Sequence, residues 1–200
     1  MRAQQLPAHP VDAARALLGA HLIANGVEVR IAETEAYGGV GEDPASHAHR
    51  GQTARNASMF GPAGLCYIYF TYGMHYCANV VVGETGVAGA VLLRAGEVVG
   101  GVDIARGRRG SQVRDRDLAR GPARLCVALG IERVDDGADL LSGEGIRLVE
   151  GQPVAAERIA SGPRVGVRHA AQRQWRFWLS GDPHVSQYRA AAPLGGGSGS

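Results

Sequence analysis

No lysine occurs in this sequence: among its 200 residues there are 21 basic side chains, and every one of them is arginine. Catalysis through a Schiff base on a side-chain amine is therefore excluded, because the chain has no such amine. Phosphate-binding loops of the Walker type are excluded as well, since they require a lysine. Chemistry in this protein has to use other side chains.

Cysteines and long apolar stretches are also scarce. Three cysteines without a C-x-x-C pair (Cys66, Cys77 and Cys126) indicate reduced thiols and argue against a cysteine-based zinc site. The apolar runs are too short for a membrane span, and the N-terminus lacks a charged start followed by an apolar signal core. We therefore expect a cytoplasmic protein.

Aromatic residues are few, eleven in all, but seven of them lie between Tyr37 and Tyr76. A pocket that stacks a planar molecule beside an acid–base group needs such a concentration of rings and polar groups. An ordinary aromatic core cluster is the alternative, and density alone does not separate the two. The polar residues beside the rings are Glu33, Glu35, His47, His49 and His75.

Apolar periodicity and turn signals predict one α+β domain around an antiparallel or mixed sheet. Two tight-turn signals between strand-like runs predict two hairpins. A glycine- and proline-rich segment between them predicts a long loop of the kind that carries function. The predicted elements are helices 11–18 and 117–129, hairpins 21–24 with 27–37 and 65–72 with 75–82, loop 38–64, and strands 90–99, 146–149, 164–168 and 176–179.

The net charge of +2 conceals two segments of opposite sign. Residues 106–124 carry seven arginines against Asp115 and Asp117, a local net charge of +5. Residues 131–150 carry six acids against two arginines, a local net charge of −4. This asymmetry predicts one basic and one acidic face, and a basic face suits a phosphate backbone. A solvated loop and helix face is the alternative.

Residues 33–37 place two carboxylates and a phenol at alternate positions. On a strand, Glu33, Glu35 and Tyr37 project to one face, opposite three small residues. A carboxylate beside an aromatic wall can activate water and stabilise a cationic, sugar-like transition state. Glutamates on an exposed sheet face are the alternative interpretation.

The loop histidines and the second hairpin carry two further hypotheses. His47 and His49 lack a third ligand at a convincing spacing, so we expect them to hydrogen-bond a ligand or cap a loop rather than bind metal. Tyr72 lies at the hairpin turn beside Gly73. An aromatic side chain there is poorly placed for a core and well placed to enter a base stack. Burial of Tyr72 by another loop is the alternative.

A series of short motifs runs in order through residues 10–189. It consists of Arg30-Ile31-Ala32-Glu33-Thr34-Glu35-Ala36-Tyr37, Glu42-Asp43-Pro44-Ala45-Ser46-His47, Arg55-Asn56, Met59-Phe60, Tyr67-Ile68-Tyr69, Tyr72-Gly73-Met74, Leu92-Leu93-Arg94, Gly121-Pro122-Ala123-Arg124-Leu125-Cys126, Arg164-Val165-Gly166 and Gly181-Asp182-Pro183-His184-Val185-Ser186. Each motif is weak alone, but the ordered series closely resembles the alkyladenine (3-methyladenine, or methylpurine) DNA glycosylase family.

The resemblance implies an enzyme that flips a damaged purine out of duplex DNA, hydrolyses its N-glycosidic bond and leaves an abasic site. The substrates it implies are 3-methyladenine, 7-methylguanine, hypoxanthine and ethenoadenine, in an order that the sequence does not give. It further implies minor-groove binding of double-stranded DNA by a monomer that needs no cofactor and no metal. For the fold it implies a single α+β domain over residues 1–194, with a curved sheet, surrounding helices and a protruding β-hairpin. Residues 195–200 are a Gly/Ser tail that we expect to be flexible.

Matched position by position, Glu35 corresponds to the general base of the family, and Glu33 does not. The other matched roles are enclosure of the flipped base (Tyr37, His47 and Tyr69), intercalation into the vacated stack (Tyr72), discrimination against the amino group of guanine (Asn79), and contact with DNA and placement of the water (Arg94). Phe60, Phe70 and Tyr76 remain candidates for the core.

Two rival functions stay open at this point. A nucleic-acid-binding module without catalysis would keep the stacking pocket, but an intact Glu35 argues against it. A hydrolase of a free nucleoside would need neither Tyr72 at a hairpin turn nor the arginines of residues 106–124. The chain departs from animal members of the family in residues 38–41, a glycine-rich loop that is one residue longer, so its pocket entrance and substrate range are open.

Overall fold

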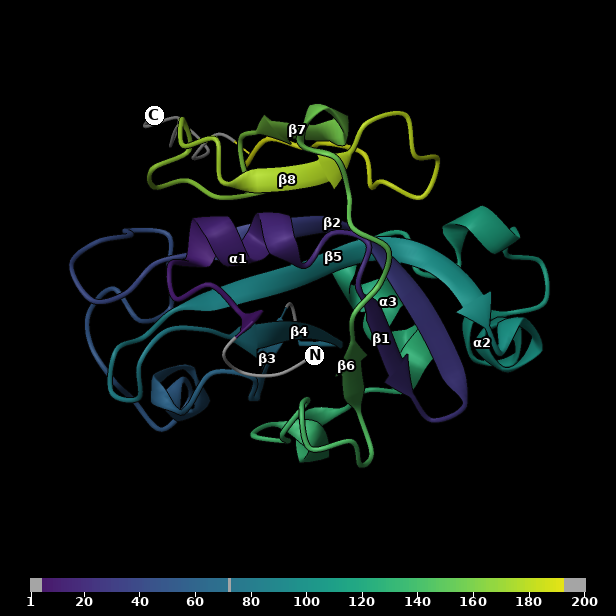
Figure 1. Ribbon diagram of the computed structural model, residues 1–200, viewed down its shortest axis with the longest axis horizontal. Coiled ribbons are helices and arrows are strands. Elements are labelled where there is room, and N and C mark those ends of the chain that lie inside the picture. The colour runs from purple at the N-terminus through teal and green to yellow at the C-terminus, as the bar shows by residue number, and fades with distance from the viewer. Residues whose placement is uncertain (1–4, 72, 193–200) are drawn as a thin grey trace, which may run out of the picture.

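The computed structural model describes residues 5–71 and 73–192 (Figure 1). Tyr72, for which we predict intercalation, and the tail at 195–200 lie outside the described residues. None of the helices in the described ranges is long and apolar enough to cross a membrane.

A curled antiparallel sheet forms the centre of the molecule. The order of its strands is β3-β4-β5-β2-β1-β6, and β8 joins β2 and carries β7 on its other side. All pairings between these strands are antiparallel, so the mixed-sheet alternative is not needed. The strands are β1 (His21–Ala24), β2 (Val27–Tyr37), β3 (Cys66–Thr71), β4 (His75–Val81), β5 (Ala90–Gly100), β6 (Arg147–Val149), β7 (Ile159–Gly162) and β8 (Arg176–Leu179).

Three α-helices within the described residues surround the sheet (Figure 1). They are α1 (Pro10–Ala16), α2 (Val102–Arg109) and α3 (Pro122–Leu129). Pro10 and Pro122 begin α1 and α3, where a missing N–H is tolerated. Gly130, with φ of +64°, ends α3 in the left-handed conformation that glycine favours. The α+β prediction is therefore confirmed.

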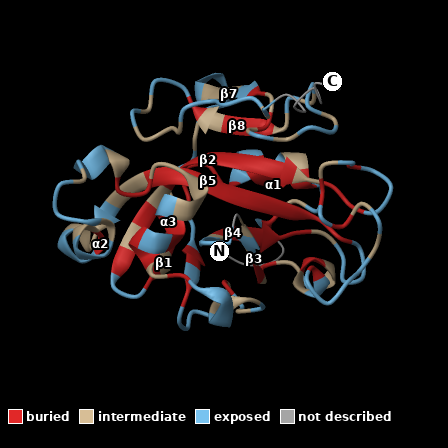
Figure 2. Ribbon diagram, turned by 180° about the vertical axis from the view of Figure 1, so that it is seen from behind, coloured by how far each residue is buried: buried red, intermediate tan, exposed pale blue. Residues whose placement is uncertain are grey.

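Strand β2 is the most enclosed element because it has partners on both edges along its length. β5 pairs with it from Glu28 to Tyr37. On the other edge, β1 covers its first half, and β8 takes over at Glu33–Glu35. Figure 2 shows β2 and β5 as buried strands, whereas α2 is largely exposed. Glu33 and Glu35 of β2 are consequently inside the protein.

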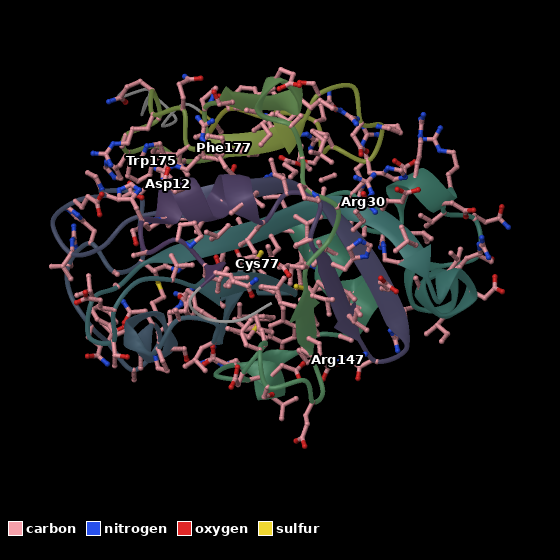
Figure 3. All side chains as sticks on the ribbon, in the orientation of Figure 1. Asp12, Arg30, Cys77, Arg147, Trp175 and Phe177 are labelled. Carbon is pink, nitrogen blue, oxygen red and sulfur yellow. The ribbon has the colours of Figure 1, made fainter. Side chains whose placement is uncertain are left out.

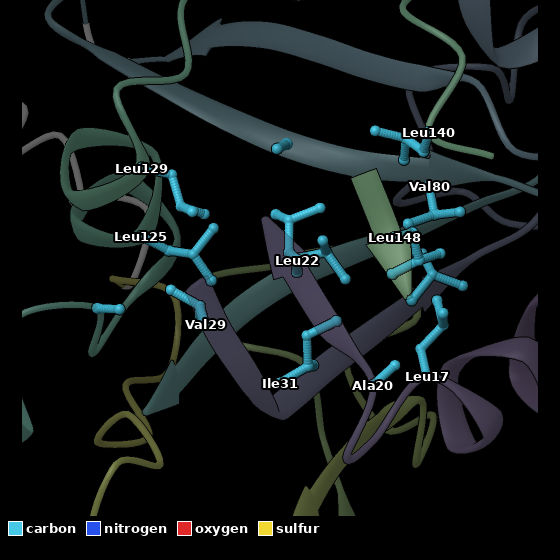
Figure 4. Packing of buried hydrophobic residues seen from close by; sticks show 14 of the residues in the cluster. Leu17, Ala20, Leu22, Val29, Ile31, Val80, Leu125, Leu129, Leu140 and Leu148 are labelled. Carbon is cyan, nitrogen blue, oxygen red and sulfur yellow. The ribbon is translucent and has the colours of Figure 1, made fainter. Parts of the chain in front are cut away.

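The main core lies on the face of the sheet that α1 and α3 cover. Leu17, Leu22, Ile31, Leu125 and Leu148 meet there from five segments of the chain (Figure 4). Burying each such leucine or isoleucine stabilises the fold by about 1.5–3 kcal/mol. The small residues of β2 face this core, and Thr34 donates a 2.8 Å hydrogen bond to the carbonyl of Ala14 in α1. The predicted alternation is confirmed from Ala32 to Tyr37, whereas a shift in the pairing with β5 after Ile31 breaks it earlier in the strand.

Several sequence-based boundaries are wrong for local reasons. The helix predicted at 117–129 begins at Pro122, because Gly121 has φ of +128° and interrupts the chain after a 3-10 turn at Asp115–Asp117. Residues 164–168 form no strand, and strand β7 precedes them instead. Helix α2 escaped prediction because glycine and arginines obscure its apolar face. Phe70 is 43% exposed rather than in the core.

Candidate active site

A cavity of about 970 Å³ opens on the face of the sheet opposite the main core. Its volume is at the upper end of small-molecule sites, ~300–1,000 Å³. β2, β3, β4, β5 and the loop after β2 each contribute lining side chains, so one hollow gathers residues from positions 37 to 94. The lining includes all five residues predicted to bind the substrate, Tyr37, His47, Tyr69, Asn79 and Arg94.

Glu35 lies directly behind the wall of this cavity. Its side chain is fully buried, so the alternative of an exposed glutamate is wrong. The Val165 N–H donates to Glu35 Oε1 at 2.7 Å, and the Tyr37 hydroxyl donates to Oε2 at 2.9 Å. Arg94 Nη1 lies 3.1 Å from Oε2. All three partners of Glu35 line the cavity, so the carboxylate lies next to the cavity wall.

Glu33 is equally buried but has a different set of partners. Its Oε1 accepts from Arg94 Nε at 2.8 Å and from Arg176 Nε at 2.6 Å. The N–H of Ser186 donates to Oε2 at 2.7 Å, and its hydroxyl donates to Oε1 at 3.0 Å. Burial alone would raise the pKa of Glu33, but the two guanidiniums outweigh it and hold that pKa below its usual range. Four donors therefore bind this carboxylate, three of them at Oε1.

Arg94 connects the two glutamates. It is 5% exposed, and it reaches Glu33 through Nε and Glu35 through Nη1. Burial would lower its pKa, yet the two carboxylates raise it well above the usual value. Arg94 therefore stays charged, and its guanidinium plane is fixed on two edges.

Aromatic rings form the wall on the side of the loop. The His47 ring meets the Tyr69 ring edge-on, with centroids 4.6 Å apart, and His47 Nδ1 pairs with the Tyr67 hydroxyl at 2.9 Å. Burial of the His47 ring and the charge of Arg55 lower the pKa of His47. Burial raises the pKa of Tyr37 and Tyr69 far above the usual value, and for Tyr37 the Glu35 charge adds to it. The wall is therefore uncharged at neutral pH.

Asn79 forms part of the floor beside these rings. It is 3% exposed, and its Nδ2 donates to the carbonyl of Tyr67 at 2.9 Å. Because this bond fixes the orientation of the amide, Asn79 presents a rigid polar edge to the cavity.

A buried ion pair behind Tyr37 was not predicted from the sequence. Arg164 binds Asp43 through Nη1 at 2.5 Å and Nη2 at 2.8 Å, and both side chains are completely buried. The guanidinium of Arg164 lies 4.7 Å from the centre of the Tyr37 ring and 5.3 Å from that of Trp175, which Figure 3 labels beside α1. Both residues stand in the family-like motifs, but no local pattern connects positions 43 and 164.

This ion pair also explains why residues 164–168 form no strand. Arg164 turns inward to Asp43, and the next N–H, that of Val165, is used by the Glu35 carboxylate. Gly166 has φ of +69°, and its N–H donates to the carbonyl of Arg189. The backbone groups are thus taken by the site rather than by a neighbouring strand.

Arginines of the basic segment line the outer part of the cavity. Arg109 Nε donates to the carbonyl of Leu118, Arg120 Nε to that of Val185, and Arg114 Nε to the Asp117 carboxylate. Burial, and after it the charge of Arg124, lower the pKa of Arg109. Such a rim attracts phosphates. The four arginines of the rim are Arg109, Arg114, Arg120 and Arg124.

The remaining polar candidates do not form a metal centre in the described ranges. No group of three histidine, cysteine or acidic side chains within residues 5–71 and 73–192 is arranged to hold a metal ion. Cys66, Cys77 and Cys126 are all free and buried, as expected for reduced thiols. Of these, Cys77 lines the cavity and is labelled near the centre of Figure 3.

Known proteins resemble this chain along nearly its whole length. The family model described as methylpurine-DNA glycosylase (MPG) matches residues 4–183. A protein of Nocardia farcinica is 55% identical over 191 residues, which cover 93% of this chain and 90% of that protein. One of Streptomyces avermitilis is 50% identical, with 93% and 91% covered, and one of Mycobacterium tuberculosis is 48% identical, with 99% and 100% covered. All three are provisionally named 3-methyladenine DNA glycosylases. The chain belongs to the methylpurine-DNA glycosylase family and is a DNA repair hydrolase that cleaves N-glycosyl bonds.

Proposed function

We propose that this glycosylase excises alkylated and deaminated purines by means of a water molecule that Glu35 activates. The observation that supports this most directly is the environment of Glu35. Of its two oxygens, Oε2 is shared between Tyr37 and Arg94, whereas Oε1 accepts one hydrogen bond, from Val165, among the described residues. The second lone pair of Oε1 is available to a water molecule.

The reaction then follows from ordinary acid–base chemistry. Glu35 takes a proton from the water, the water oxygen bonds to the anomeric carbon of the deoxyribose, and the electrons of the N-glycosidic bond leave with the base. Bases alkylated at N3 or N7, such as 3-methyladenine and 7-methylguanine, are cationic and leave without further protonation. Hypoxanthine and ethenoadenine are neutral and need a proton on the leaving base. The chain has no lysine, which favours water over a side-chain amine as nucleophile and an abasic site as product.

The cavity supports a role for the other predicted residues in recognition. Tyr37, His47 and Tyr69 would enclose the flipped base, because a cationic purine stacks well on electron-rich rings. Asn79 presents an amide edge that would help to discriminate against the amino group of guanine. Arg94 would orient Glu35 and approach the DNA. Its role, like theirs, is a proposal.

DNA would approach through the outer part of the same cavity. The rim arginines suit the phosphates, and the β3–β4 hairpin would enter the minor groove with Tyr72 filling the vacated stack. A wedge of this kind offsets part of the few kcal/mol that unstacking requires. We propose that the enzyme acts as a monomer and without a metal.

The experiment that tests the proposal is single-turnover excision by Glu35→Gln. We expect lesion-duplex affinity within a few-fold of the wild type, because the amide keeps the shape of the side chain. The excision rate should fall at least ~10²-fold, as for loss of a general base. Excision of 7-methylguanine at a near wild-type rate would remove Glu35 from the role of base.

A further inference from the structure

Glu33 has no part in the reaction proposed above, although it is as buried as Glu35. Arg94 binds both carboxylates, Glu33 Oε1 through Nε at 2.8 Å and Glu35 Oε2 through Nη1 at 3.1 Å. A second guanidinium, that of Arg176, reaches Glu33 from β8 at 2.6 Å. The four side chains form a row of alternating charge, Glu35–Arg94–Glu33–Arg176, and none is more than 5% exposed.

Each charged side chain of the row affects the charge state of its neighbour. An unpaired charge is strongly disfavoured in a buried site, so each charge of the row needs a partner. Glu33 supplies the second anion and fixes the plane of the guanidinium. A second carboxylate would also oppose ionisation of Glu35, because like charges repel at short range. Arg176 cancels that effect by pairing with Glu33.

We propose that Glu33 and Arg176 are positioning residues, which fix Arg94 and keep the buried row electrically neutral so that Glu35 is ionised when DNA is bound. Neither touches the substrate; both act through Arg94. The inference rests on the proposed function, since it takes Glu35 as the general base.

The other groups that face Glu35 do not supply this balance. Tyr37 from β2, Tyr69 from β3 and Cys77 from β4 are neutral over the pH range of the test, because burial raises the pKa of each. Arg164, from the segment after β7, also faces Glu35, but its charge is matched by Asp43. The charges that influence ionisation of Glu35 are therefore those of Arg94, Glu33 and Arg176 in the row itself.

Two substitutions change the charge of the row in opposite directions. Glu33→Gln leaves the row with a net charge of +1, and Arg176→Gln leaves it with −1. Single-turnover excision of 7-methylguanine is measured with enzyme in excess over duplex, from about pH 4.5 to about pH 9. This range covers roughly the pH values at which ordinary Glu and His side chains titrate. This lesion is suitable because its cationic base leaves without protonation, so the acid side of the profile reports ionisation of the enzyme.

We expect the midpoint of the acid side to move to lower pH in Glu33→Gln and to higher pH in Arg176→Gln, each by about one pH unit. The double variant is neutral and should return the midpoint to that of the wild type. Glu97→Gln is the matched control, because it removes a carboxylate from an ion pair of the same sheet, and Arg30 keeps Asp182 as a partner. Its midpoint should not move.

A purely structural role would lower the rate at every pH and leave the midpoint unchanged. An unchanged midpoint, or a shift of both single variants in the same direction, overturns the inference. If Glu33→Gln does not fold, the pH profile of Arg176→Gln alone decides the question. That variant should fold, because Glu33 keeps its hydrogen bonds from Arg94 and Ser186. Failure of the general-base proposal is distinguishable, since it would appear as an active Glu35→Gln variant.

Discussion

Arg164 shows how much of the pocket depends on a single residue away from the substrate. Its guanidinium binds Asp43 in the loop after β2, stacks on the Tyr37 ring, and donates to the carbonyl of Ala36 at 2.9 Å. The following residue, Val165, supplies the N–H that binds Glu35. One buried ion pair therefore sets the position of an aromatic wall and of the proposed base.

Asp43→Asn should be strongly destabilising, because it leaves the Arg164 charge buried without its anion. We expect a loss of about 3–5 kcal/mol in the free energy of unfolding, measured by urea denaturation. Asp103→Asn makes the same chemical change in an ion pair whose aspartate is 97% exposed, and it should cost under about 1 kcal/mol. Equal effects of the two substitutions would contradict the importance of the buried pair.

At the scale of single residues, the sequence predicts which side of a strand a side chain faces better than it predicts which distant side chain it contacts. Strand alternation correctly placed Glu33 and Glu35 on one side, where Arg94 binds both. It did not distinguish their roles; the family resemblance predicts that Glu35 is the base and Glu33 is not. The pairing of Asp43 with Arg164 spans 121 positions, and no periodicity connects residues so far apart. The exposure of Phe70 was likewise missed, because the pattern does not show where a hairpin leaves the core.

Among the elements, the β3–β4 hairpin is held from an unexpected side. β3 is the last strand of the sheet, and an unpaired edge would leave backbone groups unsatisfied. The acidic segment covers it: Asp136 accepts from the N–H of Ile68 at 2.8 Å and from the Ser58 hydroxyl at 3.0 Å. The carbonyl of Ala138 accepts from the N–H of Cys66. Part of the acidic segment is therefore a structural support for the hairpin.

Asp136→Ala should loosen this edge without touching the cavity. We expect a loss of about 1–3 kcal/mol in the free energy of unfolding, because the buried Ile68 N–H loses its acceptor. Hydrogen exchange at the Ile68 amide should accelerate more than at the amides of β2. Asp136→Asn keeps an acceptor oxygen and should recover most of the protection. If the Ile68 amide exchanges equally fast in the wild type and in Asp136→Ala, Asp136 does not stabilise the edge of β3.

Element prediction succeeded where signals were local and failed where they were not. The Asn25-Gly26 turn and the glycine at position 73 located both hairpins. Helix α3 was predicted too long, since Gly121 and Pro122 determine its start through backbone geometry rather than through apolar periodicity. The segment at 164–168 reads as a strand, but its backbone is used by Glu35 and by the C-terminal segment.

On the scale of the whole molecule, the active site is closed by the last quarter of the chain. β8 covers the second edge of β2 at Glu33–Glu35, and Arg164, Arg176 and Ser186 complete the ion network. Burial of the glutamates therefore depends on a strand that follows them by more than 140 positions, which alternation within β2 does not reveal. Folding and assembly of the site are coupled, because the same carboxylates serve both.

This coupling predicts that the enzyme loses stability in acid. Burial would raise the pKa of Glu33, Asp43 and Asp182, but their arginine partners outweigh it and hold all three below the usual range. The folded state then binds fewer protons than the unfolded chain, so the stabilisation is complete above the unfolded pKa of about 4 and disappears as pH falls through the folded values.

The measurement that checks this is the urea midpoint of the wild type and of Glu33→Gln between pH 7 and pH 3. For the wild type we expect little change down to about pH 5 and a steady decline below it. Glu33→Gln starts from a lower midpoint at pH 7 and declines less steeply, because one of the three carboxylates no longer titrates. A wild-type midpoint that stays constant to pH 3, or parallel declines of the two proteins, would show that these ion pairs do not govern acid stability.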